Sequence, residues 1–429
     1  MAKIIPFKGL IYDSKKIGKN YAKVVAPPYD VIPPEKRDEL YSKSDYNVVR
    51  LILPESADGD STEFGKYTRA NEVLENWIDR GVLARDDKKA LYIYSQEYET
   101  DGKKRERIGF FALMKIGEAE GDEVLPHEYT LAKPKADRMN LIKEVRGNLS
   151  PIFSLYDGAG CITEILKKEI AVSEPAIDIH LDGVRHKFWA VRNEETVGVI
   201  CSAMEEKKVF IADGHHRYEV AKAYRDLKRN SPGYDGYADY VMMYFTDLSV
   251  PDGLTVFPTH RIIKSMTEID VNEIRSRLNE YFSVSECSDL ADLVGKLNSD
   301  VSKNYAFGFF NGDKYLFMES KDKEKLLGLV SEDRSAQWKN LDVSVLHSAV
   351  LSKILEIETA EGNLVYARRA EEAVAIVKKG SGNAAFFLRP TRVEQLKAVA
   401  ELGEMMPQKS TYFYPKLLTG LVINKFARA

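Results

Sequence analysis

The sequence predicts a mixed α/β (α+β) protein. Segments with the helical spacing of apolar residues alternate along the chain with short, continuous apolar runs. Helical spacing is clear at residues 64–79 and 215–230, and a buried strand is expected at 239–247. Two Asx-Gly pairs, Asp101-Gly102 and Asn311-Gly312, lie between strand-like runs, as is typical of β-hairpins. The length of 429 residues fits two to three domains.

Composition and charge are those of an ordinary soluble globular protein, with 44% hydrophobic residues, 30% charged residues and a net charge of −4. No long block of Lys and Arg is present, which weakens any expectation of nucleic-acid binding. The cysteines are odd in number and widely spaced, so we expect no disulfide framework and a cytoplasmic location. No apolar run is long enough to predict a membrane span.

Changes in composition divide the chain into three regions. Residues 1–115 are an N-terminal α/β region, which includes a strand-like stretch at 48–54. An acidic, glycine-containing segment at 116–125 opens a second region, residues 116–264. Residues 265–429 form a C-terminal α/β region, and we expect its last segment to return to the functional site of the second region.

The most informative motif lies at residues 209–219, VFIADGHHRYE, where an apolar run ends in polar residues and a helical pattern follows at once. A strand, a tight turn and a helix start would place the positive end of a helix dipole beside basic side chains, which is a typical anion site. Asp213 adds a carboxylate that could bind a divalent cation or accept a proton. The alternative is a surface cluster in which Asp213 only caps the helix. The candidate phosphate ligands are Gly214, His215, His216 and Arg217.

A second polar motif, PHEYT at residues 126–130, precedes a predicted helix that carries basic residues. Glu128 is a candidate general base, with His127 and Thr130 beside it. Lys133 and Arg138 are candidate partners for phosphate oxygens. Spacing alone fits equally well a capping loop that starts a helix.

A third motif, PQKSTYFYPK at residues 407–416, combines lysines and hydroxyls with aromatic residues. Lys409, Ser410 and Thr411 are candidate phosphate ligands, and the aromatic rings could stack on a base. The alternative is an edge strand with one aromatic face on the core. Two further proline-fixed loops supply candidate cleft residues, namely Tyr29, Asp30 and His260.

Several familiar signatures are missing from the sequence. It has no GxxxxGK[ST] phosphate loop, no GxSxG elbow and no HExxH zinc motif. Gly380-Ser381-Gly382 follows a predicted helix and precedes a predicted strand, the reverse of the dinucleotide-binding order. It is interpreted as a turn that ends a helix.

The DGHHRY turn resembles the signature of the ParB/sulfiredoxin-like superfamily, whose members bind nucleotide phosphates at a helix start. The order PHE, DGHHR and a late KST segment is similar to that of the free-serine kinases. The chain also resembles, over nearly its whole length, a large family with APPYDV, PHExT, DGHHRY and KSTYFYPK motifs.

These resemblances imply a ParB/sulfiredoxin-like nucleotide-binding core in residues 116–264 and transfer of a phosphoryl group from ATP or ADP to free L-serine, giving O-phosphoserine. Glu128 would deprotonate the serine hydroxyl, and Asp213 would lie near the reacting phosphoryl group and Mg²⁺. Residues 214–217 would bind phosphate, and residues 409–411 would close over the site.

Two alternatives belong to other functional classes. One is a nucleotide-binding regulator of the ParB type, against which the acidic pI of 6.1 and the lack of a helix-turn-helix pattern argue. The other is an ATPase or nucleotidase whose acceptor is water. Homodimer formation is left open.

Overall fold

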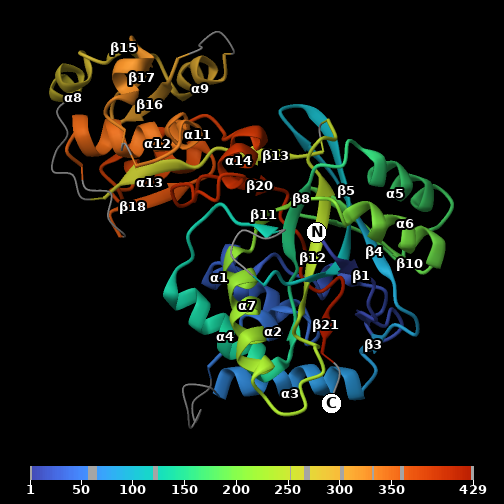
Figure 1. Ribbon diagram of the computed structural model, residues 1–429. Helices are drawn as coiled ribbons and strands as arrows, with labels where there is room; N and C mark the ends of the chain where they lie inside the picture. Colours follow the sequence, from blue (N-terminus) through green and yellow to red (C-terminus); the bar gives the residue numbers. More distant parts are fainter. Residues whose placement is uncertain are drawn as a thin grey trace. The chain divides into compact units, whose positions relative to one another are not determined.

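Two compact units make up the computed structural model, which describes residues 2–56, 65–118, 124–251, 253–264, 271–299, 304–330, 333–357 and 362–426 (Figure 1). Unit 1 comprises residues 1–126, 130–255 and 415–429, and unit 2 comprises residues 127–129 and 256–414. Both units combine helices with a sheet, so the predicted mixed α/β class is confirmed. Residues 119–123 of the predicted boundary segment lie outside the described residues.

Unit 1 is built on a mixed sheet with the strand order β6-β11-β8-β12-β5-β4-β10-β9, in which β1 also pairs with β5. Its strands are β1 (Ile4–Ile5), β4 (Leu91–Thr100), β5 (Lys103–Lys115), β6 (Val124–Leu125), β8 (Ile152–Tyr156), β9 (Ile177–Leu181), β10 (Val184–Val191), β11 (Val209–Asp213) and β12 (Tyr240–Asp247). Strand β11 runs parallel to β6 and antiparallel to β8, which places the end of the DGHHR strand between two neighbours.

Helices cover this sheet. Helices α5 and α6 pack on a core of sheet residues that includes Phe110 and Phe245. Helices α4 and α7 lie side by side and share a smaller cluster with Ile142, Val220 and Tyr224 (Figure 1). The helices of unit 1 are α1 (Pro34–Lys43), α2 (Val49–Ile52), α3 (Gly65–Asp79), α4 (Ala132–Val145), α5 (Cys161–Ala171), α6 (Glu194–Met204), α7 (His215–Arg229) and the 3₁₀ turns η1 (Tyr21–Lys23) and η2 (Tyr29–Val31).

Short ladders complete unit 1. Strand β2 (Leu10–Tyr12) pairs with β3 (Leu83–Arg85), and β7 (Gly147–Asn148) pairs with β21 (Asn424–Lys425). The second ladder attaches the end of the chain to the loop that leaves α4.

The hairpin predicted at Asp101-Gly102 is confirmed. Strands β4 and β5 pair from Thr100 opposite Lys103, so the loop has two residues. Both have positive φ angles, +52° at Asp101 and +68° at Gly102. Positive φ at both central positions matches the right-handed twist of the strands, and Asx-Gly adopts it at low cost.

The strand expected at residues 48–54 is wrong, because residues 49–52 form the short helix α2. The Asn47 side chain accepts the amide hydrogen of Val49 at 2.9 Å and donates to the Lys23 carbonyl at 2.8 Å. Val49, Leu51 and Ile52 are buried in this conformation. A short apolar run fits a buried strand or a buried helical turn equally well, and here the turn that the Asn47 side chain forms with the Val49 amide favours the helix.

Unit 2 contains an antiparallel sheet with the order β15-β17-β16-β19-β14-β18. Helices α9 and α13 pack on it through a core that includes Leu293, Val374 and Phe387. Its elements are β13 (Thr255–Phe257), β14 (His260–Ile263), α8 (Val271–Leu278), β15 (Phe282–Cys287), α9 (Leu290–Asn298), β16 (Ala306–Phe310), β17 (Tyr315–Ser320), α10 (Lys323–Leu327), α11 (Ala336–Lys339), α12 (Asp342–Ser344), the π-helix η3 (Val345–Ile354), β18 (Leu364–Ala367), α13 (Ala370–Lys378), β19 (Ala384–Phe387), α14 (Val393–Ala400) and β20 (Tyr412–Tyr414).

The observed division differs from the three predicted regions. Strands β4 and β5 of region 1–115 share a sheet with β8, β11 and β12 of region 116–264, so most of these two regions lies in one unit. Residues 415–429 belong to unit 1 rather than to the C-terminal unit. Alternating elements along a chain do not reveal which strands share a sheet, because sheet pairing is set by long-range packing.

None of the helices in the described residues combines the length and the apolar character that a membrane-spanning helix needs.

Candidate functional site

The centre of the candidate site in unit 1 is the junction between β11 and α7, where Asp213 ends the strand and His215 starts the helix. The register of β11 against β8 shifts between Ile211 and Asp213, because β11 has one residue more than β8 at this point, a β-bulge. Such bulges bend a strand and redirect its side chains, and they are common beside functional sites. The junction therefore presents Asp213 next to the positive end of the α7 dipole.

Gly214 connects the two elements in a conformation that favours glycine. Its φ is +97°, and a Cβ atom at this position would lie 2.9 Å from the Arg217 guanidinium carbon. Glycine therefore allows the turn and lets the Arg217 guanidinium lie directly against the backbone.

Replacing Gly214 with Ala is expected to destabilise the protein more than the same change at Gly233. Gly233 also has a positive φ, +74°, but has open space around its Cβ position. Gly233→Ala should cost about 1–2 kcal/mol for the backbone alone. Gly214→Ala should cost about 1 kcal/mol more, because the Arg217 guanidinium must leave its partners. Urea unfolding measures both values, and equal losses would contradict this account.

Asp213 lies between two cations. Its Oδ2 is 2.9 Å from Nη2 of Arg217, and its Oδ1 is 3.0 Å from Nζ of Lys416. The three side chains are 17%, 11% and 12% exposed, respectively. Burial alone would raise the pKa of Asp213, but Lys416, Arg217 and His215 outweigh it and hold this pKa well below its usual range. These three side chains, one carboxylate and two cations, carry a formal net charge of +1.

Lys416 was not among the site residues that the sequence predicted, although it closes the KSTYFYPK motif. Its backbone carbonyl accepts a hydrogen bond from Nε2 of Gln96 at 3.0 Å, and the preceding Pro415 carbonyl accepts one from Arg107. Arg107 is buried and stacks 4.5 Å from the ring centroid of Phe153. Strands β4 and β5 thus fix the backbone from which Lys416 reaches Asp213. The separation of 203 positions between Lys416 and Asp213 hides this contact from local sequence analysis.

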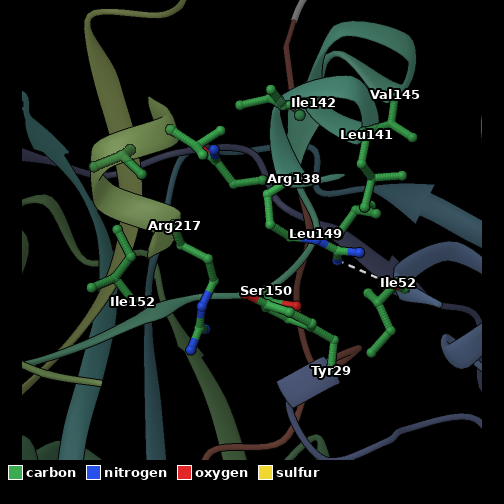
Figure 2. Close-up of a pocket in the computed structure, with 14 residues that line it drawn as sticks. Tyr29, Ile52, Arg138, Leu141, Ile142, Val145, Leu149, Ser150, Ile152 and Arg217 are labelled. Carbon is green, nitrogen blue, oxygen red and sulfur yellow. Dashed lines mark hydrogen bonds between the residues drawn. The ribbon is translucent and has the colours of Figure 1, made fainter. Parts of the chain in front are cut away.

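Arg217 also lines a pocket, which is drawn in Figure 2. Tyr29 and Arg138 share this pocket, and the Arg138 guanidinium lies 4.1 Å from the ring centroid of Tyr29. Arg138 donates to the Ile52 carbonyl at 2.8 Å and to the Asp137 carboxylate at 2.9 Å. Asp137 also lies 3.2 Å from Nζ of Lys66, so this cluster, like that at Asp213, has one carboxylate between two cations.

The rest of this pocket is mostly apolar, with Leu141, Ile142 and Val145 from α4 and Val220 from α7. Tyr29 has its pKa raised, chiefly by burial, with Arg138 acting against the increase. The phenol is therefore neutral at physiological pH and available as a hydrogen-bond donor.

The two histidines at the start of α7 have different surroundings. Nε2 of His216 accepts the amide hydrogen of Leu131 at 2.9 Å, which ties the start of α7 to the start of α4. This nitrogen carries no proton while it accepts that bond. His215 is buried and close enough to Asp213 to lower the pKa of that carboxyl. His216 thus connects α7 to the start of α4, and His215 lies beside the ion pairs of Asp213.

Unit 2 brings together the PHE motif and the late KST motif. His127 is buried, and its Nε2 is 3.0 Å from Oγ1 of Thr411. The His127 carbonyl accepts the amide hydrogen of Met406 at 2.7 Å, and Glu128 forms a parallel bridge with Met406. Two motifs that are far apart in the sequence therefore meet within one unit.

Arg261 holds the late segment beside Glu128. Its guanidinium donates to the carbonyls of Gln408 at 3.2 Å and Lys409 at 3.1 Å, and to Nε2 of His347 at 3.1 Å. Burial lowers the pKa of Arg261 to about 10, and the charge of Glu128 acts in the opposite direction. Glu128 thus lies in the field of a buried cation that organises residues 408–409.

Other predicted site residues lie elsewhere. His260 is buried in β14, its Nδ1 accepts the amide hydrogen of Leu388 at 3.3 Å, and burial lowers its pKa to about 4. It therefore packs within unit 2 and is not among the residues that line the Arg217 pocket. Ser410 is buried and donates to the Pro407 carbonyl. Asp30, Lys133 and Lys409 are exposed, and Thr130 is half-buried.

A divalent cation does not fit at Asp213 in this arrangement. Both carboxylate oxygens face cations, and the junction carries a net positive charge. Within the described ranges, no group of three or more His, Cys, Asp or Glu side chains could hold a metal ion. Mg²⁺ favours one or two carboxylates together with substrate phosphates. The residues present therefore support an anion, not a metal, at this position.

Fold and site together define a mixed α/β protein with a cationic strand-to-helix junction. The chain belongs to the family described as "Protein of unknown function (DUF1015)", which it matches over residues 4–344. No curated protein matches the sequence.

Solved structures with a distant likeness include a conserved hypothetical protein from Pyrococcus furiosus, at 18% identity and a TM-score of 0.34, covering 74% of this chain and 95% of that one. Free serine kinase in complex with AMP matches at 16% identity and a TM-score of 0.34, covering 71% and 86%. C-terminally truncated SbnI from Staphylococcus aureus matches at 12% identity and a TM-score of 0.35, covering 73% and 86%.

Proposed function

We propose that this protein is a nucleotide-dependent phosphotransferase that moves a phosphoryl group from ATP or ADP to the hydroxyl of a small metabolite, with free L-serine as the first acceptor to test. The observation that carries the proposal is the Asp213 ion-pair cluster with Arg217 and Lys416 at the first turn of α7. The resemblance of the PHE, DGHHR and KST motifs to those of the free-serine kinases supports the same reaction.

The charge at the junction suits the phosphate tail of a nucleotide. Phosphoryl transfer depends mainly on positioning and on neutralising the charge of the phosphate oxygens, with little covalent chemistry left to the protein. Arg217 and Lys416 supply two charge-assisted donors, and α7 adds the positive end of its dipole. The side chains are nearly buried, so their fields are screened less than those of surface lysines.

Asp213 holds these two cations close together and is a poor proton acceptor. A carboxyl with a pKa well below its usual range stays ionised at neutral pH and binds protons weakly. Asp213 therefore positions Arg217 and Lys416, and a different group takes the proton of the acceptor hydroxyl.

Glu128 is the proposed general base. In this role its carboxylate would take the proton of the acceptor hydroxyl as the oxygen attacks the phosphorus atom and the nucleotide leaves. Its surroundings in unit 2 suit such a role, because Arg261 organises the adjacent backbone of residues 408–409 and His127 contacts Thr411. A Mg²⁺ ion that enters with the nucleotide substrate would supply further charge neutralisation.

The direct test incubates the full chain with Mg²⁺, ATP or ADP, L-serine and a pool of other hydroxyl-bearing metabolites. Mass spectrometry should detect a new phosphomonoester whose amount grows with enzyme and time. Formation of O-phosphoserine would support the complete proposal, and another phosphomonoester would correct the acceptor only. Release of inorganic phosphate without any phosphomonoester would indicate that the protein is a nucleotide hydrolase and not a transferase.

A further inference from the structure

Unit 2 contains a second cavity that none of the predicted motifs occupies. Its volume is about 480 Å³, a size that suits a small metabolite. The ends of several elements surround it, among them the end of α9 and the starts of α10, α12 and α14. The polar lining residues are Asn298, Ser299, Asn304, Tyr305, Asn340 and Gln395.

Charged side chains in this cavity are mainly positive. Lys323, Arg389 and Arg392 line it together with one carboxyl, Asp342. Nε of Arg389 lies 2.9 Å from Oδ2 of Asp342. Nη2 of Arg389 donates a hydrogen bond to the Asn304 carbonyl at 3.1 Å. Arg389, Arg392 and Lys323 all lie near enough to Asp342 to lower its pKa, although burial raises that pKa overall. Among the described lining residues, three cations thus accompany one acid, a formal net charge of +2.

Two of these cations have no carboxylate partner in the described part of the chain. Nζ of Lys323 lies 5.1 Å from the ring centroid of Tyr305. The backbone amide of Arg392 donates a hydrogen bond to the side-chain oxygen of Gln395. Asp322, the acid next to Lys323, accepts the amides of Glu324 and Lys325 instead. Other exposed lysines of unit 2 do pair with acids, as Lys314 does with Glu286, but Lys379 has no ion pair among the described residues either, so the feature that sets Lys323 and Arg392 apart is their position in the lining of one cavity.

We infer that this cavity binds the phosphate monoester of a small polar metabolite. A phosphate monoester carries a charge of about −1.5 to −2 at neutral pH, which matches the net charge of the cavity. Lys323, Arg389 and Arg392 would bind the phosphate, and the amide side chains would bind hydroxyl or carbonyl groups of the remainder. This inference concerns unit 2 alone and does not depend on phosphotransfer at Asp213.

The test uses glycerol 3-phosphate as the probe and the full chain. Isothermal titration calorimetry should detect binding that weakens at least about tenfold when Lys323→Met and Arg392→Met are combined, since each loses one charge-assisted contact. Both residues are exposed, so the variant should fold as the wild type does. Lys379→Met, a change of an exposed lysine on the same unit and outside the cavity, should leave the affinity unchanged.

Hydrogen exchange locates the binding and separates it from any anion binding at Asp213. Glycerol 3-phosphate should protect amides around residues 304–305, 340–342 and 389–395, and the protection should persist in Lys416→Met. Glycerol should not bind, and succinate should bind more weakly. Equal affinity for the double variant and the wild type, or protection confined to unit 1, would overturn the inference. Equal binding of succinate would overturn the assignment to phosphate monoesters.

Discussion

Glu128→Gln is expected to lower the turnover of phosphoryl transfer by about 10²–10⁴-fold, the usual effect of removing a general base. The change keeps the size and shape of the side chain and removes its negative charge together with its ability to take a proton. Because Arg217 and Lys416, the proposed phosphate ligands, are left unchanged, the affinity for ADP should stay the same. Steady-state kinetics and equilibrium binding of ADP measure the two quantities separately.

Glu371→Gln serves as the matched control, because Glu371 is exposed on α13 of the same unit. Thermal unfolding of Glu128→Gln should be recorded as well, since its charge acts on the buried Arg261. If Glu128→Gln turns over like the wild type, Glu128 is not the base. If it also loses ADP binding, its role is not confined to proton transfer.

Asp213→Asn is expected to reduce the free energy of unfolding by about 3 kcal/mol at neutral pH. Removing one partner of a buried ion pair typically costs about 3–5 kcal/mol, because the remaining charge is left uncompensated. Here two cations would be left, Arg217 and Lys416, each close to one-tenth exposed. Urea unfolding at pH 7 measures the loss.

The effect of Asp213→Asn should depend on pH in a defined direction. The pKa of Asp213 in the folded state lies below its usual value, so its ionised form stabilises the fold. This contribution is complete above about pH 4, the ordinary range of an aspartate, and is lost as the pH falls further toward the folded-state pKa. The difference between wild type and variant should therefore be constant from pH 7 to 5 and smaller at pH 3.

Asp38→Asn provides the control for this prediction. Asp38 pairs with Arg37 on α1, and their side chains are 64% and 35% exposed, so its removal should cost less than about 1 kcal/mol. Similar losses for the two variants would show that the Asp213 cluster is no more than an ordinary surface ion pair.

Local pattern predicted much of the secondary structure around the site. The apolar run, the polar turn and the helical spacing at residues 209–230 correspond to β11 and α7, and the Asx-Gly turn corresponds to the β4–β5 hairpin. These elements are determined by residues adjacent in sequence. The strand expected at 48–54 is wrong because a short apolar run does not reveal the turn that the Asn47 side chain forms with the Val49 amide.

The long-range composition of the site could not be predicted in the same way. The sequence pointed to Lys409, Ser410 and Thr411, whereas the structure places Lys416 on Asp213 and leaves Lys409 exposed. Which lysine of one motif reaches the junction depends on Arg107 and Gln96, two buried residues of unrelated strands. His260 looked like a cleft residue, but the β14 pairings bury it.

The affinity for ADP of Lys416→Met, compared with that of Lys409→Met, tests most directly the claim that a nucleotide phosphate binds at the Asp213 junction. Both changes remove one lysine charge from the same motif, but only Lys416 contacts Asp213. We predict that Lys416→Met weakens ADP binding at least about tenfold, or about 1.4 kcal/mol, and that Lys409→Met does not. Unchanged ADP affinity in a folded Lys416→Met variant would contradict the account.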